Sequence, residues 1–243
     1  VIICTGRGLK ECLPQLRAIE QTDAVAVAGG SIIADPVTGG TLHRFAIDHA
    51  MAGACIDVMH EFELPALVLK DPHATGFDYL VAHGDPVLAL DPIMEWWFDR
   101  NGVDVRYAQH IHDDEHADHT VRVGAFGVST NISKVAQRLT PLVDDRGTMH
   151  HFPAVVGPEH RARLGPGEEF HILELFSDAG NKWSALSYLL EQSGIDPSRT
   201  AAIGDEINDM SMITSAGLGV AMGNGIAQVK AAAKHTTKRH DED

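Results

Sequence analysis

Residues 200–209 have the sequence Thr-Ala-Ala-Ile-Gly-Asp-Glu-Ile-Asn-Asp, and this stretch decides the fold. Its apolar first half predicts a short buried strand that ends at Gly204-Asp205, and a helix follows. A second apolar strand is expected over residues 218–222, and it also ends in glycine and a polar residue. Strands that alternate with helices predict a parallel sheet, and ligands bind such sheets at the carboxyl ends of their strands.

The N-terminal region has the same pattern. Residues 1–4, Val-Ile-Ile-Cys, predict a buried parallel strand that ends at Thr5-Gly6-Arg7. Apolar residues at helical spacing follow over 9–19, and an apolar run over 24–28 predicts another strand. Strand, helix and strand again indicate an α/β sheet.

The middle of the chain differs, because strands there occur in pairs between helices. We expect an α+β domain at 45–176, inserted into an α/β core formed by 1–44 and 177–243. The elements predicted in the insertion are helices near 47–62, 91–101 and 131–143 and strands near 66–70, 78–82, 121–128, 148–156 and 170–176.

Composition excludes several classes of protein. The chain has 243 residues, and 44% of them are hydrophobic, which argues against disorder. Its net charge of −15 argues against nucleic-acid binding. It has neither a run of about 20 apolar residues nor a basic-then-apolar leader, so we expect no membrane partner. Three cysteines at spacings unlike a zinc site suit a reduced, cytoplasmic protein. The sequence leaves the oligomeric state open.

Asp205 and Asp209 lie four residues apart, with Asn208 beside the second carboxylate. Carboxylate oxygens at such a spacing can hold a hard cation, and Mg²⁺ suits them best. The same residues could instead be a solvated helix start that the helix dipole favours.

Two further sites suit an anion. Lys182 lies at the start of a predicted helix, where an ammonium beside free backbone N–H groups can bind a phosphate or a carboxylate. Thr5 and Gly6 offer a hydroxyl and a backbone N–H at the end of the first strand.

Taken together, these motifs resemble the haloacid dehalogenase superfamily, and within it the Cof-type, sugar-phosphatase-like branch. The resemblance rests on Thr5-Gly6-Arg7, Lys182, residues 204–209 and the stretch 216–224, and it spans nearly the whole chain. It implies a Rossmann-like core with a parallel sheet and an inserted cap domain. It also implies a Mg²⁺-dependent phosphatase that hydrolyses a small phosphorylated metabolite, a sugar phosphate, through an aspartyl-phosphate intermediate.

The resemblance assigns a role to each matching residue. The Thr5 hydroxyl and the Gly6 backbone would bind the phosphoryl group, with Asn208 nearby, and Lys182 would neutralise that group and orient the nucleophile.

The metal would be held by the acidic motif. Asp205 would coordinate Mg²⁺, and Asp209 would support that metal site. The catalytic residues would be Lys182, Thr5 and Asp205.

The family's nucleophile motif, Asp-x-Asp-Gly-Thr, does not occur in this sequence. Its first Asp attacks phosphorus and its second acts as acid and base. We expect the motif upstream of Val1, in a protein of which these residues are a piece cut at both ends. Because the missing strand is central in the family's sheet, its neighbours, which end at Cys4 and Gly204, should have unpaired backbone groups. We therefore expect this chain alone to be poorly stable or inactive.

Other functions stay open at this point. A phosphomutase of the same superfamily would use the same motifs. A protein that binds a phosphometabolite without catalysis would lack the nucleophile by descent. A third reading is a metal-binding module in which Asp113, His116 and His119 ligate zinc.

Overall fold

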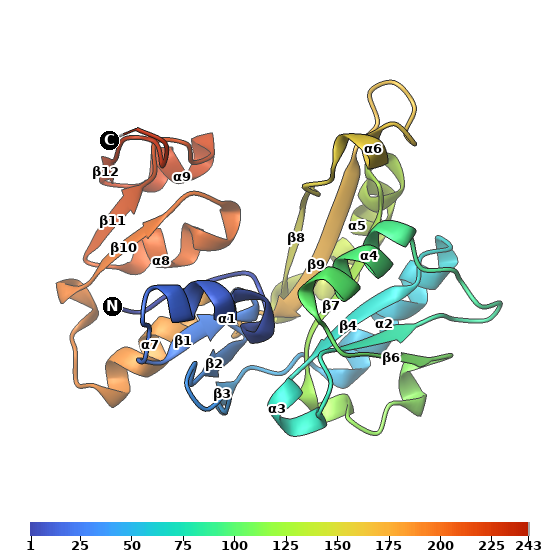
Figure 1. Cartoon of the computed structure of the whole chain (residues 1–243), viewed down its shortest axis with the longest axis horizontal. Coiled ribbons are helices and arrows are strands. Elements are labelled where there is room, and N and C mark those ends of the chain that lie inside the picture. Colours follow the sequence, from blue (N-terminus) through green and yellow to red (C-terminus); the bar gives the residue numbers. More distant parts are fainter. Residues whose placement is uncertain (243) are drawn as a thin grey trace.

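The chain folds around three separate β-sheets (Figure 1). The computed structural model describes residues 1–242. The large sheet has six strands, β4 (Ala66–Lys70), β5 (Tyr79–Ala82), β6 (Val105–Ala108), β7 (Thr120–Val128), β8 (Gly147–Pro153) and β9 (Phe170–Ser177). Two small sheets have three strands each, β1 (Val25–Val27), β2 (Ile32–Ala34) and β3 (Thr41–Arg44), then β10 (Ala201–Gly204), β11 (Leu218–Ala221) and β12 (His235–Thr236).

Helices surround these sheets. We call the elements from α2 to β9 the cap and the remaining elements the core. The cap helices are α2 (His49–Glu61), α3 (Pro72–Thr75), α4 (Pro92–Asn101), α5 (Ser129–Val143) and α6 (Pro158–Arg161), and the core helices are α1 (Leu9–Ala18), α7 (Lys182–Gln192), α8 (Met210–Ser215) and α9 (Ala227–Ala232). Short 3₁₀ turns are η1 (Ala28–Gly30), η2 (Ile111–Asp113), η3 (Ala117–His119), η4 (Asp144–Arg146), η5 (Pro197–Arg199) and η6 (Ile207–Asp209).

The cap sheet is continuous and covered on both faces. Its order is β6-β5-β4-β7-β9-β8, with only the β5–β6 pair parallel. Every residue of β4 is buried, because α2 and α5 pack on one face through residues such as Met59 and Leu139. The other face packs on the core: Leu69 of β4 shares one apolar cluster with Leu16 of α1 and Val27 of β1. The cap is thereby docked on the N-terminal part of the core.

The core sheet, in contrast, is split. Strands β1, β2 and β3 pair antiparallel, and β10, β11 and β12 pair parallel. Within residues 1–242, no backbone hydrogen bond joins residues 1–5 to β10. Side chains bridge the gap instead, since Cys4 packs both with Ala26 and with Ala202.

The strand predicted for residues 1–4 is wrong in extent. Val1 is almost fully exposed, and the only pairing is an isolated parallel bridge between Cys4 and Ala26. A β-ladder needs several successive paired residues. Here, of the residues of β1, only Ala26 exchanges backbone hydrogen bonds with this segment, through Ile3 and Thr5.

Most other predicted elements are confirmed to within a few residues, including α2, α5, β7 and β9. The elements that were not predicted are all short: the β2–β3 hairpin, α3, β6, α6, α9 and β12. Domain boundaries at 44/45 and 176/177 stay a prediction, although the six-stranded sheet lies wholly between Ala66 and Ser177.

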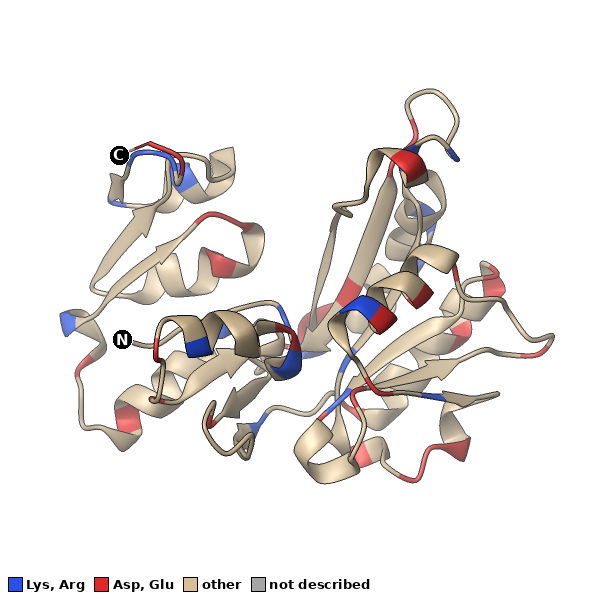
Figure 2. Cartoon of the chain, in the orientation of Figure 1, with Lys and Arg blue, Asp and Glu red and all other residues tan. Residues whose placement is uncertain are grey.

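Surface charge follows the composition. Figure 2 shows Lys and Arg scattered over the core and the cap in this view, with Asp and Glu on helices and loops of both halves. In the part of the chain that the structure describes, no helix has the length and hydrophobicity that a membrane span needs.

Candidate active site at the carboxyl ends of the core strands

A buried ion pair forms the centre of the site. Lys182 Nζ lies 2.5 Å from Asp209 Oδ1 and 3.1 Å from Asn208 Oδ1. Lys182 is 5% exposed and Asp209 4%. The other Asp209 oxygen, Oδ2, accepts hydrogen bonds from the backbone N–H groups of Asp205 at 2.8 Å and Glu206 at 3.0 Å. Asp209 therefore orients the ammonium and at the same time fixes the loop after β10.

Local structure explains the position of Lys182. It is the first residue of α7, and the Asn181 side chain caps this helix by accepting from Ser184 N at 3.0 Å. A cation is unfavourable at the positive end of a helix dipole, and Asp209 offsets that cost. Of the three ammonium N–H groups, two have acceptors within residues 1–242. The third is available to a ligand oxygen.

The Thr5–Gly6 loop is held by its backbone. Thr5 donates its N–H to Ala26 O at 2.9 Å, and Thr5 O accepts from Gly29 N at 3.0 Å. Thr5 Oγ1 accepts from Arg7 N at 3.2 Å, which leaves the hydroxyl hydrogen free to donate. The Gly6 N–H has no hydrogen-bond partner within the described residues 1–242. This loop thus presents two donors to an anion.

Asn208 connects the loop to the lysine. A Cβ atom on Gly6 would lie 3.2 Å from Asn208 Nδ2, so the absence of a side chain lets the two approach. Asn208 in turn accepts from Lys182. Thr5, Gly6, Lys182, Asn208, Asp209 and Asp205, the residues predicted from the sequence, therefore lie in one connected group.

A cation would be held mainly by Asp205. Its Oδ2 accepts from Asn224 Nδ2 at 3.0 Å, and its Oδ1 has no partner within residues 1–242. Both Asp209 oxygens are already engaged, so direct ligation by Asp209 stays a prediction. The described residues contain no group of three His, Cys, Asp or Glu side chains that could hold a metal. One free carboxylate still suits Mg²⁺, which in proteins keeps several waters and binds phosphate oxygens.

The sequence analysis missed two nearby side chains. Cys4 lies close to the ion pair, and burial raises the pKa of its thiol to about 11, so it is no nucleophile at neutral pH. His150 of β8 lies on the cap side. Its ring packs against Phe176, and burial and the charge of Lys182 lower the pKa of His150. The position of His150 could have been predicted only from the order of strands in the cap sheet.

The predicted zinc ligands do not gather. His116 packs against the ring of Phe77, and Asp113 accepts a hydrogen bond from His110 N at 3.3 Å. In the part of the chain that the structure describes, this segment forms no metal site. The neighbouring Asp114 pairs with the buried Lys70 instead.

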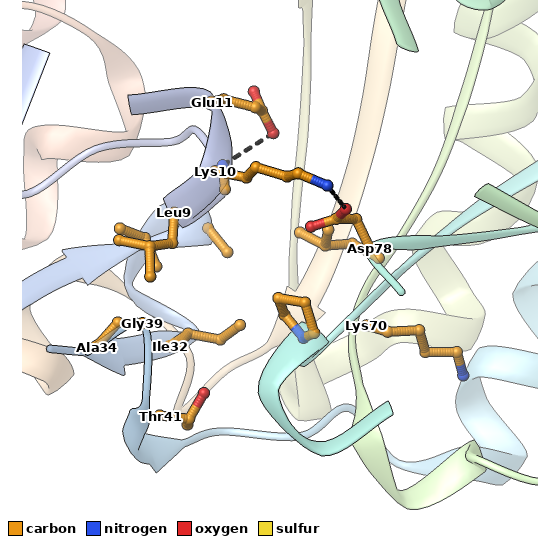
Figure 3. Close-up of a pocket in the computed structure, with 14 residues that line it drawn as sticks. Leu9, Lys10, Glu11, Ile32, Ala34, Gly39, Thr41, Lys70 and Asp78 are labelled. Atoms are coloured by element: carbon orange, nitrogen blue, oxygen red, sulfur yellow. Dashed lines mark hydrogen bonds and ion pairs between the residues drawn. The ribbon is translucent and has the colours of Figure 1, made fainter. Parts of the chain in front are cut away.

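A cavity lies elsewhere, between α1 and the cap (Figure 3). Its volume of about 20 Å³ has room for a water molecule, and none of the predicted site residues lines it. Lys10 points across it to Asp78, at 3.4 Å. The candidate site is therefore the group around Lys182, not this cavity.

The fold and the site define an α/β protein with a docked cap, in which a buried lysine, an asparagine and two aspartates gather beside the Thr5–Gly6 loop. The chain matches the family of haloacid dehalogenase-like hydrolases over residues 1–243, and it belongs to that family.

Relatives and solved structures agree with this assignment. The chain is 40% identical over 85 residues to a 5-amino-6-(5-phospho-D-ribitylamino)uracil phosphatase of Bacillus subtilis, a match that covers 35% of this chain but only 30% of the relative. A haloacid dehalogenase-like hydrolase from Bacteroides thetaiotaomicron has a similar structure, with a TM-score of 0.72 and 22% identity over 100% of this chain and 82% of that one. The structure of a sugar phosphatase of subclass IIB is also similar, with a TM-score of 0.71 and 18% identity. The match covers 100% of this chain and 81% of that chain. The predicted fold class is confirmed.

Proposed function

We propose that this protein is a Mg²⁺-dependent phosphatase that hydrolyses a small phosphorylated metabolite, a sugar phosphate, through an aspartyl-phosphate intermediate. One observation carries the proposal: a buried ammonium with an unused N–H is joined, through Asn208, to a loop with a free backbone N–H. Such preorganised donors stabilise the charge of a transferring phosphoryl group. The names of the relatives, a ribitylaminouracil phosphatase and a sugar phosphatase, support this substrate class.

Each residue would contribute a distinct interaction. Lys182 would donate its third N–H to a phosphoryl oxygen, while Asp209 and Asn208 hold the ammonium in place. The Gly6 N–H and the Thr5 hydroxyl would donate to the other oxygens. Because the lysine is buried, its charge acts through a medium less polar than water and is less screened.

Asp205 would hold the metal, with Asn224 fixing the carboxylate through the hydrogen bond at Oδ2. When bound there, Mg²⁺ would supply positive charge to the phosphoryl oxygens and orient them.

The proposal requires a nucleophilic aspartate that the 243 residues do not supply, because no Asp-x-Asp-Gly-Thr motif occurs among them. The first experiment is to sequence the coding DNA upstream of the codon for Val1. The proposal predicts an in-frame Asp-x-Asp-Gly-Thr motif within about one βαβ element, roughly 30 residues. A start codon at Val1 without that motif would overturn the aspartyl-phosphate route and favour a protein that binds phosphometabolites without catalysis.

The second experiment measures phosphate release from a panel of sugar phosphates by the full translated product, with and without Mg²⁺. We expect Mg²⁺-dependent release that Lys182→Ala abolishes, while Lys230→Ala, in α9, retains it. Transfer of phosphate to a second sugar hydroxyl, with no free phosphate, would identify a phosphomutase instead.

A further inference from the structure

One cap residue contacts the Thr5–Gly6 loop directly. Arg122 of β7 donates from Nη1 to Gly6 O at 3.1 Å. It also pairs with Glu174 of β9, 2.6 Å away, and donates from Nη2 to the Tyr79 hydroxyl at 2.6 Å. Arg122 is 7% exposed. Its other two partners belong to the cap, so the bond to Gly6 is a buried polar link from the cap to the core.

Other polar contacts also join the two parts. Thr41 and Arg44 of β3 bond to the buried Asp71 of the cap at 2.6 and 2.7 Å. Within residues 1–242, however, only Arg122 bonds from the cap to the Thr5–Gly6 loop.

Lys10 of α1 reaches Asp104 of the cap at 2.6 Å, but both side chains are exposed to solvent. Exposed ion pairs contribute little, typically about 0–1 kcal/mol. A buried guanidinium with several acceptors of fixed geometry holds its partners far more firmly.

The Gly6 carbonyl belongs to the Gly6–Arg7 peptide unit, which directly follows the unit that carries the Gly6 N–H. The N–H end of this unit, on Arg7, donates to Thr5 Oγ1 at 3.2 Å. Its carbonyl end accepts from Arg122. With both ends held, rotation of this unit is restrained. It thereby restrains the adjoining Gly6 N–H and, through the Arg7 N–H, the Thr5 hydroxyl.

We propose that Arg122 is a positioning residue that couples docking of the cap to the shape of the Thr5–Gly6 loop. When the cap is docked, the loop holds its donors ready for an anion; when the cap moves away, the loop loses this support. The identity of the anion as a phosphoryl group rests on the proposed function, whereas the coupling itself rests on the contacts of Arg122.

The test compares a double variant with a single one. Arg122→Met combined with Glu174→Gln removes the link without leaving a buried unpaired charge. Tyr79→Phe removes one cap partner of Arg122 but retains the Glu174 pair and the bond to Gly6, and is the matched control. The readout is amide hydrogen exchange at Arg7, Ala28 and Gly29, whose N–H groups hold the loop.

In the double variant we expect these loop amides to exchange about tenfold faster, the effect of losing a hydrogen bond to a charged group. The β7–β9 ladder should keep its protection, and the control should exchange like the unaltered chain. Loop amides at their original rates in a double variant with a folded cap would overturn the proposal.

A second measurement uses the unaltered chain, and so does not depend on any variant folding. Coupling is reciprocal, so an anion on the loop must stabilise the docked cap. Inorganic phosphate with Mg²⁺ should slow exchange in the loop and along β7 together. Protection of the loop without β7 would contradict the coupling. If phosphate does not bind at all, the proposed function fails, while the comparison of variants still decides the role of Arg122.

Discussion

Two buried lysines, Lys70 in the cap and Lys182 in the core, form ion pairs that differ in how many of the ammonium N–H groups have acceptors. Lys70 is fully buried and uses all three N–H groups, on Asp114 Oδ2, Thr120 Oγ1 and His116 O. Lys182 is 5% exposed and has acceptors for two of its three N–H groups within residues 1–242. A saturated ammonium stabilises its own fold, whereas an unsaturated one can bind a further oxygen.

The surroundings of the two lysines support this distinction. Lys70 lies in a continuous six-stranded sheet, and its partners fix the segment between β6 and β7. Lys182 lies between two small sheets, where strand ends and helix starts leave polar groups accessible. Both lysines pair with an aspartate. They differ in their surroundings and in the number of ammonium N–H groups that have acceptors.

The largest expected difference comes from removing each lysine. Lys182→Ala should weaken binding of inorganic phosphate by about 100-fold, because a hydrogen bond from a charged group is lost. Lys70→Met should leave phosphate affinity unchanged but lower the free energy of unfolding by about 3–5 kcal/mol, since it leaves Asp114 buried and unpaired. Calorimetric titration and urea unfolding measure the two effects. A loss of phosphate affinity in Lys70→Met would abolish the distinction.

Asp209→Asn is expected to combine both effects. It removes the charge that Lys182 needs and alters the acceptor for two backbone N–H groups. We expect a loss of about 3 kcal/mol in stability, comparable with breaking the Lys70 pair, together with weaker phosphate binding. Thermal unfolding and titration on the same sample separate this variant from Lys182→Ala, which removes the ammonium and leaves both of those N–H bonds. A fully stable Asp209→Asn variant would mean that the pair does not organise the loop.

A smaller effect is expected at Asn224, which holds the Asp205 carboxylate. Asn224→Ala should weaken Mg²⁺ binding about tenfold, as is usual when a group that orients a metal ligand is lost. Phosphate affinity without Mg²⁺ should be unchanged. Equal Mg²⁺ affinity in both proteins would argue against a metal at Asp205.

The smallest effect concerns pH. Burial and the nearby Lys182 charge lower the pKa of His150 below its ordinary value of 6.5. The unfolded chain therefore takes up this proton first as the pH falls, so stability declines from about pH 6.5 down to the folded pKa and is level below it. His150→Gln should flatten this part of the profile, as measured by urea unfolding at several pH values. Bound phosphate should raise the pKa of His150, and an NMR titration unaffected by phosphate would place the ring away from the site.

Much of the arrangement could be predicted from the sequence. Long periodic segments such as α5 and the regular runs of β7 and β9 carry strong local signals, and they were placed to within a few residues. The grouping of the six candidate residues was also predictable, because the alternating pattern predicts that polar strand ends gather at one edge. In the split core sheet, side-chain contacts bring these residues together.

Other features depend on contacts distant in sequence. The β2–β3 hairpin has strands of three and four residues, too short for a periodic signal. Arg122 and His150 gain their meaning from the order of strands in the cap sheet and from how the cap docks, which no local pattern encodes. The segment 1–4 has a strong strand pattern, but it forms only one bridge, because pairing needs neighbours on the sheet.

The most direct test of the site is a calorimetric titration of inorganic phosphate into the 243-residue chain, with and without Mg²⁺, beside Lys182→Ala and Lys70→Met. We predict binding that Mg²⁺ strengthens, that Lys182→Ala weakens by about 100-fold, and that Lys70→Met leaves intact. Phosphate binding of equal strength in folded samples of all three proteins would contradict the assignment of Lys182 to the phosphoryl site.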